Sequence, residues 1–293
     1  GARSKAASLN ASLPQRRIVD GNHLGELPDG ARAVYELLKQ QIDANTGIPQ
    51  SLRDQLPQAI HEILTVTPDA MGLVQRARPG ATPMSRNLMH RTRGAGFAYE
   101  LVGTAALIRG GSVSVHGDGL RIDATTDRLD FGPKAQARHS GAESQFEGLI
   151  SRLIDTWMTI GADDNELRRR PRNATLLETL PRLARKTVES DLLICRATDG
   201  DFREIGVDFK RTARGRYAGG ISPEQLTGVL IALCTGELHE FHFVTNGRLG
   251  GRDRMLIDGV RQVARDSDPE TIVTCHEFVG ASDQGSTAGW IQR

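Results

Sequence analysis

The chain has 293 residues, of which 38% are hydrophobic and 25% charged, and its formal net charge at pH 7 is +1. These proportions are those of an ordinary soluble globular protein with enough material for one large domain or two smaller ones. The balanced charge excludes a strong overall field that would attract nucleic acid, so any such attraction must come from local patches.

The three cysteines, Cys195, Cys234 and Cys275, are far apart and odd in number. Their spacing fits neither a disulfide framework nor a zinc site, and it predicts buried thiols in a reducing environment. No apolar run approaches the length of a membrane span. We therefore expect a cytoplasmic protein without a membrane anchor.

Three segments are expected along the chain. Residues 1–27 lack sustained periodicity and predict a linker or flexible arm. Residues 28–84 carry apolar residues at helical spacing in two stretches, which predicts a small helical N-terminal unit. Residues 85–293 are expected to form the main domain, with a long and partly helical insertion at about 119–187.

Periodicity also predicts most of the individual elements. Helices are expected at about 29–45, 51–64, 94–107, 143–160, 222–233 and 254–265, and strands at about 112–116, 240–246 and 271–279. With the hairpin described next, the order from Gly94 is helix, strand, insertion, strand, strand, helix, strand, helix, strand. This order predicts an α/β fold.

Two β-prone runs, 189–195 and 204–210, flank the pair Asp199-Gly200. Such a pair is a strong signal for a tight β-hairpin, because a type I′ turn needs positive φ at both central positions. If this pair forms the loop, the register of the hairpin places Asp191 opposite Asp208.

Side chains alternate between the two faces of a strand, so this register gives the hairpin one apolar and one charged face. The apolar face carries Leu192, Ile194, Ile205, Val207 and Phe209. The charged face carries Asp191, Asp208 and Lys210. Because two opposed carboxylates repel each other, we expect a cation between them, either Lys210 or a divalent metal ion. A surface hairpin with a solvated or ion-paired acidic pair is the alternative.

Basic segments lie on both sides of the hairpin. The segment 210–220 is rich in glycine and contains Arg211, Arg214 and Arg216. Its composition suits contacts with phosphate groups, and equally suits any exposed loop. A second basic run, at about 168–186, precedes the hairpin.

Two further polar residues are notable because of the helices that carry them. Glu100 is the only acid in the first apolar helix of the main domain, although a lone Glu also fits a solvent-facing position. Gln225 lies in the first turn of its helix, where a capping box accounts for it locally. For His239 and His242 we expect structural roles, since no third metal ligand shares their face.

An Asp near the start of one strand, Asp-Phe-Lys on the next and a preceding helix with a Glu together resemble the PD-(D/E)xK superfamily of restriction-endonuclease-like nucleases. The family core is a helix, three strands, a helix and a strand, arranged as a mixed sheet flanked by helices. Asp191 matches the first acidic position of the motif, Asp208 the second, Lys210 the lysine and Glu100 the acid of the first core helix. Gln225 falls where several subfamilies carry a glutamine.

The chain departs from the family pattern in two places. Ser190 replaces the proline of the motif. The long insertion also leaves Glu147, on a later helix, as an alternative to Glu100.

The resemblance implies a magnesium-dependent endonuclease that hydrolyses phosphodiester bonds in nucleic acid, with DNA favoured over RNA. Asp191, Asp208, Glu100 and the carbonyl of Phe209 would hold Mg²⁺ or Mn²⁺, and Lys210 would stabilise the charged transition state. Neighbouring phosphates would be bound by three arginines: Arg211, Arg214 and Arg216.

A looser resemblance is to the nuclease modules of bacterial polymorphic toxins. It lies in the glycine-rich entry to the helix of Glu100 and in the absence of a starting methionine. It implies a module that acts in the cytoplasm of a target cell and is neutralised by an immunity protein. Three alternatives stay open: a tRNA-cleaving toxin of the same fold, a catalytically silent module that binds nucleic acid or a partner, and a structural protein whose acids pair with arginines.

Overall fold

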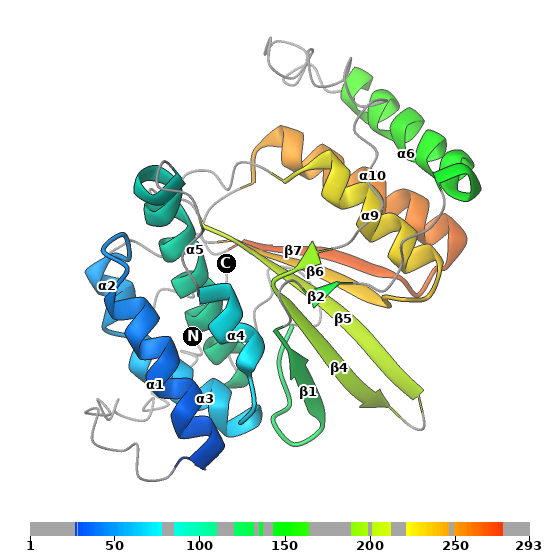
Figure 1. Ribbon diagram of the computed structural model, residues 1–293. Helices are drawn as coiled ribbons and strands as arrows, with labels where there is room; N and C mark the ends of the chain where they lie inside the picture. Colours follow the sequence, from blue (N-terminus) through cyan, green and yellow to red (C-terminus); the bar gives the residue numbers. More distant parts are fainter. Residues whose placement is uncertain are drawn as a thin grey trace, which may run out of the picture.

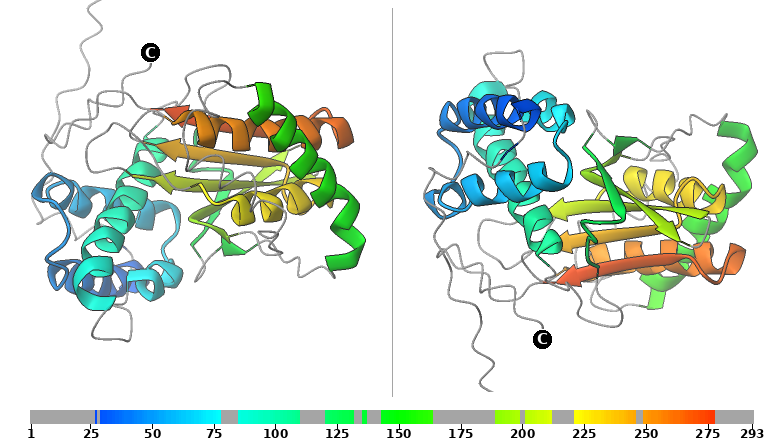
Figure 2. Two further views of the ribbon diagram at one scale, coloured as in Figure 1. Left: turned by 90° about the horizontal axis from the view of Figure 1, so that it is seen from above. Right: turned by 90° about the horizontal axis from the view of Figure 1, so that it is seen from below.

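Helices cover both faces of a five-stranded mixed sheet in this computed structural model (Figures 1 and 2). The structure describes residues 27, 29–77, 85–109, 120–131, 135–136, 143–163, 189–198, 201–211, 221–245 and 249–277. The expected α/β class is confirmed. Among the described helices, none combines the length and the apolar character needed to cross a bilayer.

The bounds of most elements agree closely with the expected ranges, but the helix expected to start at Gly94 starts at Ser85, and the helix Met71–Ala77 was not expected. The helices are Asp29–Asp43 (α1), Gln50–Arg53 (α2), Leu56–Val66 (α3), Met71–Ala77 (α4), Ser85–Ile108 (α5), Glu143–Asp163 (α6), Pro223–Cys234 (α9) and Gly251–Ser267 (α10). The strands are Asp127–Asp130 (β1), Ala135–Gln136 (β2), Glu189–Ser190 (β3), Leu192–Thr198 (β4), Asp201–Lys210 (β5), Glu240–Thr245 (β6) and Ile272–Glu277 (β7). The single helix expected at 51–64 is divided into α2 and α3, because Pro57 cannot continue a helix but is favoured in its first turn.

The five strands lie in the order β1-β4-β5-β6-β7. The pairs β1–β4 and β4–β5 are antiparallel, whereas β6 is parallel to β5 and β7 is parallel to β6. Parallel neighbours need a crossover connection. The helices α9 and α10 lie in these two crossovers, between β5 and β6 and between β6 and β7. Strands β2 and β3 form a separate two-stranded ladder.

The expected register of the β4–β5 hairpin is confirmed. Leu192 pairs with Val207, Ile194 with Ile205 and Thr198 with Asp201, so the connection falls at residues 199–200, which lie outside the described part of the chain. All five side chains of the apolar face are buried.

Each face of the sheet has its own hydrophobic core. On the face with the apolar side of the hairpin, the core includes α1, α3, α4 and α5, so these helices and the sheet bury one continuous cluster. On the opposite face, α6, α9 and α10 pack around Phe241 and Phe243 of β6. Helix α5 approaches β5 very closely at Gly103, where a Cβ atom would lie 2.5 Å from the ring of Phe209.

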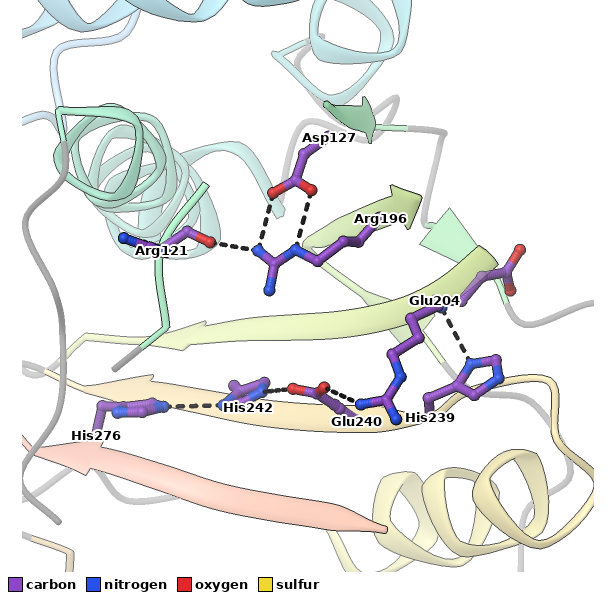
Figure 3. Close-up of polar contacts among 9 residues, drawn as sticks. Arg121, Asp127, Arg196, Glu204, His239, Glu240, His242 and His276 are labelled. Atoms are coloured by element: carbon purple, nitrogen blue, oxygen red, sulfur yellow. Dashed lines mark hydrogen bonds and ion pairs between the residues drawn. The ribbon is translucent and has the colours of Figure 1, made fainter. Parts of the chain in front are cut away.

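Strand β1 lies within the segment expected to be an insertion. It pairs with β4 and is fixed there by Asp127, which is buried and forms a two-point ion pair with Arg196 (Figure 3). The Arg196 Nε donates to Oδ1 at 3.0 Å and Nη2 to Oδ2 at 2.9 Å. This part of the expected insertion is therefore a strand of the sheet, and the strand expected at 112–116 lies outside the described residues.

The remainder of the expected insertion contributes α6, which packs against α9 and α10. Trp157 of α6 is fully buried, and its Nε1 donates to the carbonyl of Leu256 at 2.8 Å. The three cysteines are free thiols, as expected. Only Cys195 is buried, whereas Cys234 and Cys275 are partly exposed, which corrects the expectation that all three are buried.

Candidate active site

The charged side of the hairpin lies where the end of β5 meets the start of β4. Asp191 precedes β4 directly, and its backbone N–H donates to the carbonyl of Val207 at 2.9 Å. The carboxylate of Asp191 in turn accepts from the backbone N–H of Phe209 at 2.8 Å. These two bonds hold Asp191 beside Asp208, as the register of the hairpin predicts.

Asp208 is buried and is held by two nitrogen donors. Lys210 Nζ lies 2.7 Å from Oδ2 of Asp208, and Gln225 Nε2 donates to the same oxygen at 3.0 Å. Burial alone would raise the pKa of Asp208. The charge of Lys210, with the hydrogen bonds that Lys210 and Gln225 donate to Asp208, outweighs burial and lowers this pKa below its usual value. Asp208 is therefore an ionised carboxylate.

Lys210 is the cation that the opposed carboxylates require. Its side chain is 25% exposed. Burial would lower its pKa, but the contact with Asp208 and the charges of Asp191 and Glu100 raise the pKa above its ordinary value. Lys210 therefore stays protonated, and it is surrounded by three acids from β5, the segment before β4, and α5.

The local structure of α9 brings Gln225 to this site. Ser222 caps the helix by accepting a hydrogen bond from the backbone N–H of Gln225 at 3.4 Å, and Pro223 occupies the first helical position. This confirms the Ser222 half of the expected capping box. The side-chain amide nitrogen of Gln225, however, donates to Asp208, so local capping does not fully account for this residue.

The structure distinguishes between the two candidate helical acids. Glu100 of α5 is half-buried, and its charge raises the pKa of Lys210. Glu147 is exposed on α6, whose buried side packs into the other core around α9 and α10. Of these two acids, the structure brings Glu100 to the site.

Of the basic residues that were expected to contact phosphate groups, only Arg211 lies in the described part of the chain. Arg211 follows β5 directly and is half-buried, near enough to Tyr99 of α5 to influence its pKa. Arg214 and Arg216 lie outside the described residues, as does the basic run at 168–186.

A divalent cation at this site would have two carboxylates and few other protein ligands. In the described part of the chain, no three His, Cys, Asp or Glu side chains form a group that could hold a metal ion. The residues that fit such an ion are Asp191 and Asp208, with the backbone carbonyl of Phe209. Mg²⁺ is commonly bound by one or two carboxylates and completes its shell with water and substrate phosphate oxygens, so this donor set suits Mg²⁺.

A second polar cluster, which the sequence did not reveal, lies on β6 and β7 (Figure 3). His242 contacts Glu240 on one side and His276 on the other, at 3.1 Å and 2.9 Å. His239 accepts a hydrogen bond from the backbone N–H of Glu204 at 3.1 Å, which agrees with its expected structural role. The two histidines of the cluster meet only because β6 and β7 pair in parallel, and no local sequence pattern shows that pairing.

Comparisons with protein-family models, with curated proteins and with solved structures find no match to this chain.

Proposed function

We propose that this chain is a metal-dependent nuclease that hydrolyses phosphodiester bonds in nucleic acid, with DNA favoured over RNA as the substrate. One observation carries the proposal: Asp191, Asp208 and Lys210 converge at the adjoining ends of β4 and β5. Glu100 from one helical layer and Gln225 from the other reach the same cluster.

The arrangement of the elements supports the resemblance to PD-(D/E)xK nucleases. The order α5, β1, β4, β5, α9, β6 reproduces a helix, three strands, a helix and a strand. Their strands are also neighbours in the sheet, in the order β1-β4-β5-β6. In this assignment, β1 takes the place first expected for residues 112–116, and α10 and β7 extend the core.

Each residue of the cluster has a chemical task in the proposed reaction. Asp191 and Asp208 would hold a Mg²⁺ or Mn²⁺ ion, which supplies charge stabilisation and lowers the pKa of a bound water. Lys210 is protonated, so it would stabilise negative charge on the phosphate rather than accept a proton. Gln225 would fix the carboxylate plane of Asp208 through its hydrogen bond. Arg211 would bind a neighbouring phosphate.

The biological setting is proposed from the resemblance that lies in the glycine-rich entry to the helix of Glu100. As a toxin module, the chain would act in the cytoplasm of a target cell and would be neutralised there by an immunity protein. A tRNA-cleaving toxin of the same fold uses the same chemistry on RNA, so the substrate distinguishes it.

A second candidate is a catalytically silent module that binds nucleic acid or a partner protein. One observation favours it: Lys210 and Gln225 both occupy Oδ2 of Asp208. In such a module Lys210 would be a permanent counter-ion rather than a group that acts on a phosphate.

The test incubates the purified protein with plasmid DNA and, separately, with total RNA, in Mg²⁺ or in chelator. We expect Mg²⁺-dependent cutting of DNA that is lost in Lys210→Met and Asp208→Asn. The exposed residues Lys39 and Asp201 provide matched controls, Lys39→Met and Asp201→Asn, which should cut normally.

The other outcomes separate the alternatives. Loss of tRNA with intact DNA would identify the tRNA-cleaving toxin. Tight nucleic-acid binding without cutting would identify the silent module. The nuclease proposal is contradicted by wild-type protein that neither cuts nucleic acid nor binds a divalent ion in calorimetry.

A further inference from the structure

Three side chains on β6 and β7 form a continuous chain of contacts, from the half-buried Glu240 to the buried His242 and His276 (Figure 3). His242 Nε2 lies 3.1 Å from Oε2 of Glu240, and His242 Nδ1 lies 2.9 Å from Nε2 of His276. The two rings stack at an interplanar angle of 21°. Their residues are 4% and 1% exposed, so water cannot solvate a charge on either ring.

The pairing of the strands determines which groups surround this chain. Val244 pairs with His276 and belongs to the core on the α5 face, so His242 and His276 lie on that face too. On α5, burial strongly raises the pKa of Tyr99, and the charge of Glu100 acts on Lys210. The hydrogen bond from His242, with the charges of His242, Arg203 and Arg196, lowers the pKa of Glu240. Arg203 of β5 reaches Glu240 at 3.5 Å. From the opposite face, Arg261 of α10 donates to the carbonyl of Val273.

The contacts among Glu240, His242 and His276 fix the position of each imidazole proton when both histidines are neutral. The carboxylate of Glu240 only accepts, so Nε2 of His242 carries a proton and donates it. A neutral His242 then has a bare lone pair on Nδ1, and Nε2 of His276 must donate to it. His276 is left with a bare lone pair on Nδ1, and this atom is buried without a hydrogen-bond partner in the described structure.

In the folded protein, the Glu240–His242–His276 cluster can therefore take up only a limited number of additional protons. One proton can be held, because a protonated His242 lies against the Glu240 carboxylate. A second would place two imidazolium rings in contact inside an apolar core, where burial and like charge both oppose it. Burial, together with the charge of His242, lowers the pKa of His276 to about 3.

We propose that the Glu240–His242–His276 chain is a pH-sensitive latch, which ties β7 to β6 at neutral pH and weakens on mild acidification. In the unfolded chain both histidines take up protons near their ordinary pKa of 6.5, whereas the folded latch accepts one at most. Because the unfolded state binds the additional proton, the unfolding equilibrium constant rises by up to tenfold for each pH unit below 6.5. This latch is independent of the proposed nuclease chemistry, although β6 is also the neighbour of β5.

The test compares urea unfolding of the wild type and of His276→Gln between about pH 7 and about pH 5.5. Gln keeps a donor toward His242 but cannot take up a proton. Over this range, we expect the unfolding equilibrium constant of the wild type to rise by a factor about ten times larger than that of the variant. Equal pH dependence in the wild type and in His276→Gln would overturn the proposal.

A measurement on the wild type alone keeps the proposal testable if the variant does not fold. The nitrogen chemical shifts of the histidine rings report both tautomer and charge. We expect His276 to carry its proton on Nε2 at neutral pH and to remain uncharged at about pH 5.5. A proton on Nδ1 at neutral pH, or a charged His276 ring in the folded protein at that pH, would contradict the latch.

Discussion

Lys210 Nζ lies 2.7 Å from Oδ2 of Asp208, one of the two carboxylates that would bind the divalent ion of the proposed nuclease. Two positive charges about 4 Å apart repel by several kcal/mol at an effective dielectric constant near 20. Lys210 and the metal ion of the proposed nuclease therefore compete for Asp208. We expect Lys210→Met to bind Mn²⁺ at least about tenfold more tightly than the wild type while it loses cutting.

Isothermal titration calorimetry with Mn²⁺ measures this competition directly, and Lys39→Met is the control for loss of a positive charge elsewhere. Weaker binding in Lys210→Met would show that Lys210 supports the metal site, and equal binding would show that Lys210 does not compete with the ion. Absence of binding in both proteins would instead contradict the metal site.

The close approach of α5 to β5 predicts opposite effects of two identical substitutions in one helix. Gly103→Ala would place a Cβ atom 2.5 Å from the Phe209 ring, so we expect it to destabilise the fold by about 1–3 kcal/mol. Gly96→Ala meets no atom within 4 Å and should stabilise α5 by about 0.5–1 kcal/mol through helix propensity. Urea denaturation measures both. Equal effects would show that α5 does not pack against Phe209 as described.

The ion pair between Asp127 and Arg196 predicts a large effect at a strand that looks unremarkable in the sequence. The Asp127 side chain is 0% exposed and that of Arg196 is 28% exposed. Removal of one partner leaves a buried charge without its counter-ion, so Arg196→Met should cost about 3–5 kcal/mol. The double variant Asp127→Leu with Arg196→Met should recover much of this loss. Denaturant midpoints of the wild type, both single variants and the double variant measure this coupling, and a loss in the double variant equal to the sum of the two single losses would refute it.

The Asp208–Lys210 pair predicts loss of stability at both ends of the pH scale. The lowered pKa of Asp208 lies below 3.8, so its contribution is complete above pH 3.8 and is lost as pH falls through the folded pKa. The raised pKa of Lys210 lies above 10.5, so its contribution is complete below pH 10.5 and is lost as pH rises through the folded pKa. Denaturation across this range should show the alkaline loss in the wild type and in Lys39→Met. If the loss of stability at alkaline pH persists in Lys210→Met, a group other than Lys210 causes it.

The hairpin was predictable because two independent signals agree in the sequence. The pair Asp199-Gly200 predicts the position of the turn, and the alternation of apolar residues excludes a register shifted by one residue. Together they place Asp191, Asp208 and Lys210 on one face. The contact of Gln225 with Asp208 was not predictable with the same strength, since it depends on how α9 packs across the sheet.

Features that depend on contacts between residues far apart in the sequence could not be predicted from the sequence. Strand β1 has only four residues, Asp-Arg-Leu-Asp, and its place in the sheet depends on Arg196. The contact between His242 and His276 depends on the crossover through α10 that brings β7 beside β6. Local propensity carries no information about either partner, so these contacts appear only when the chain has folded.

The ion pair that fixes β1 also has a consequence for the order in which the chain folds. Asp127 and Arg196 are 69 residues apart, whereas the strands of the β4–β5 hairpin are joined by a two-residue connection. The entropy lost on closing a loop grows with its length, and nonlocal pairings form slowly for that reason. We therefore expect the hairpin, with both of its aspartates and its lysine, to assemble early, and β1 to join a preformed edge as one of the last steps.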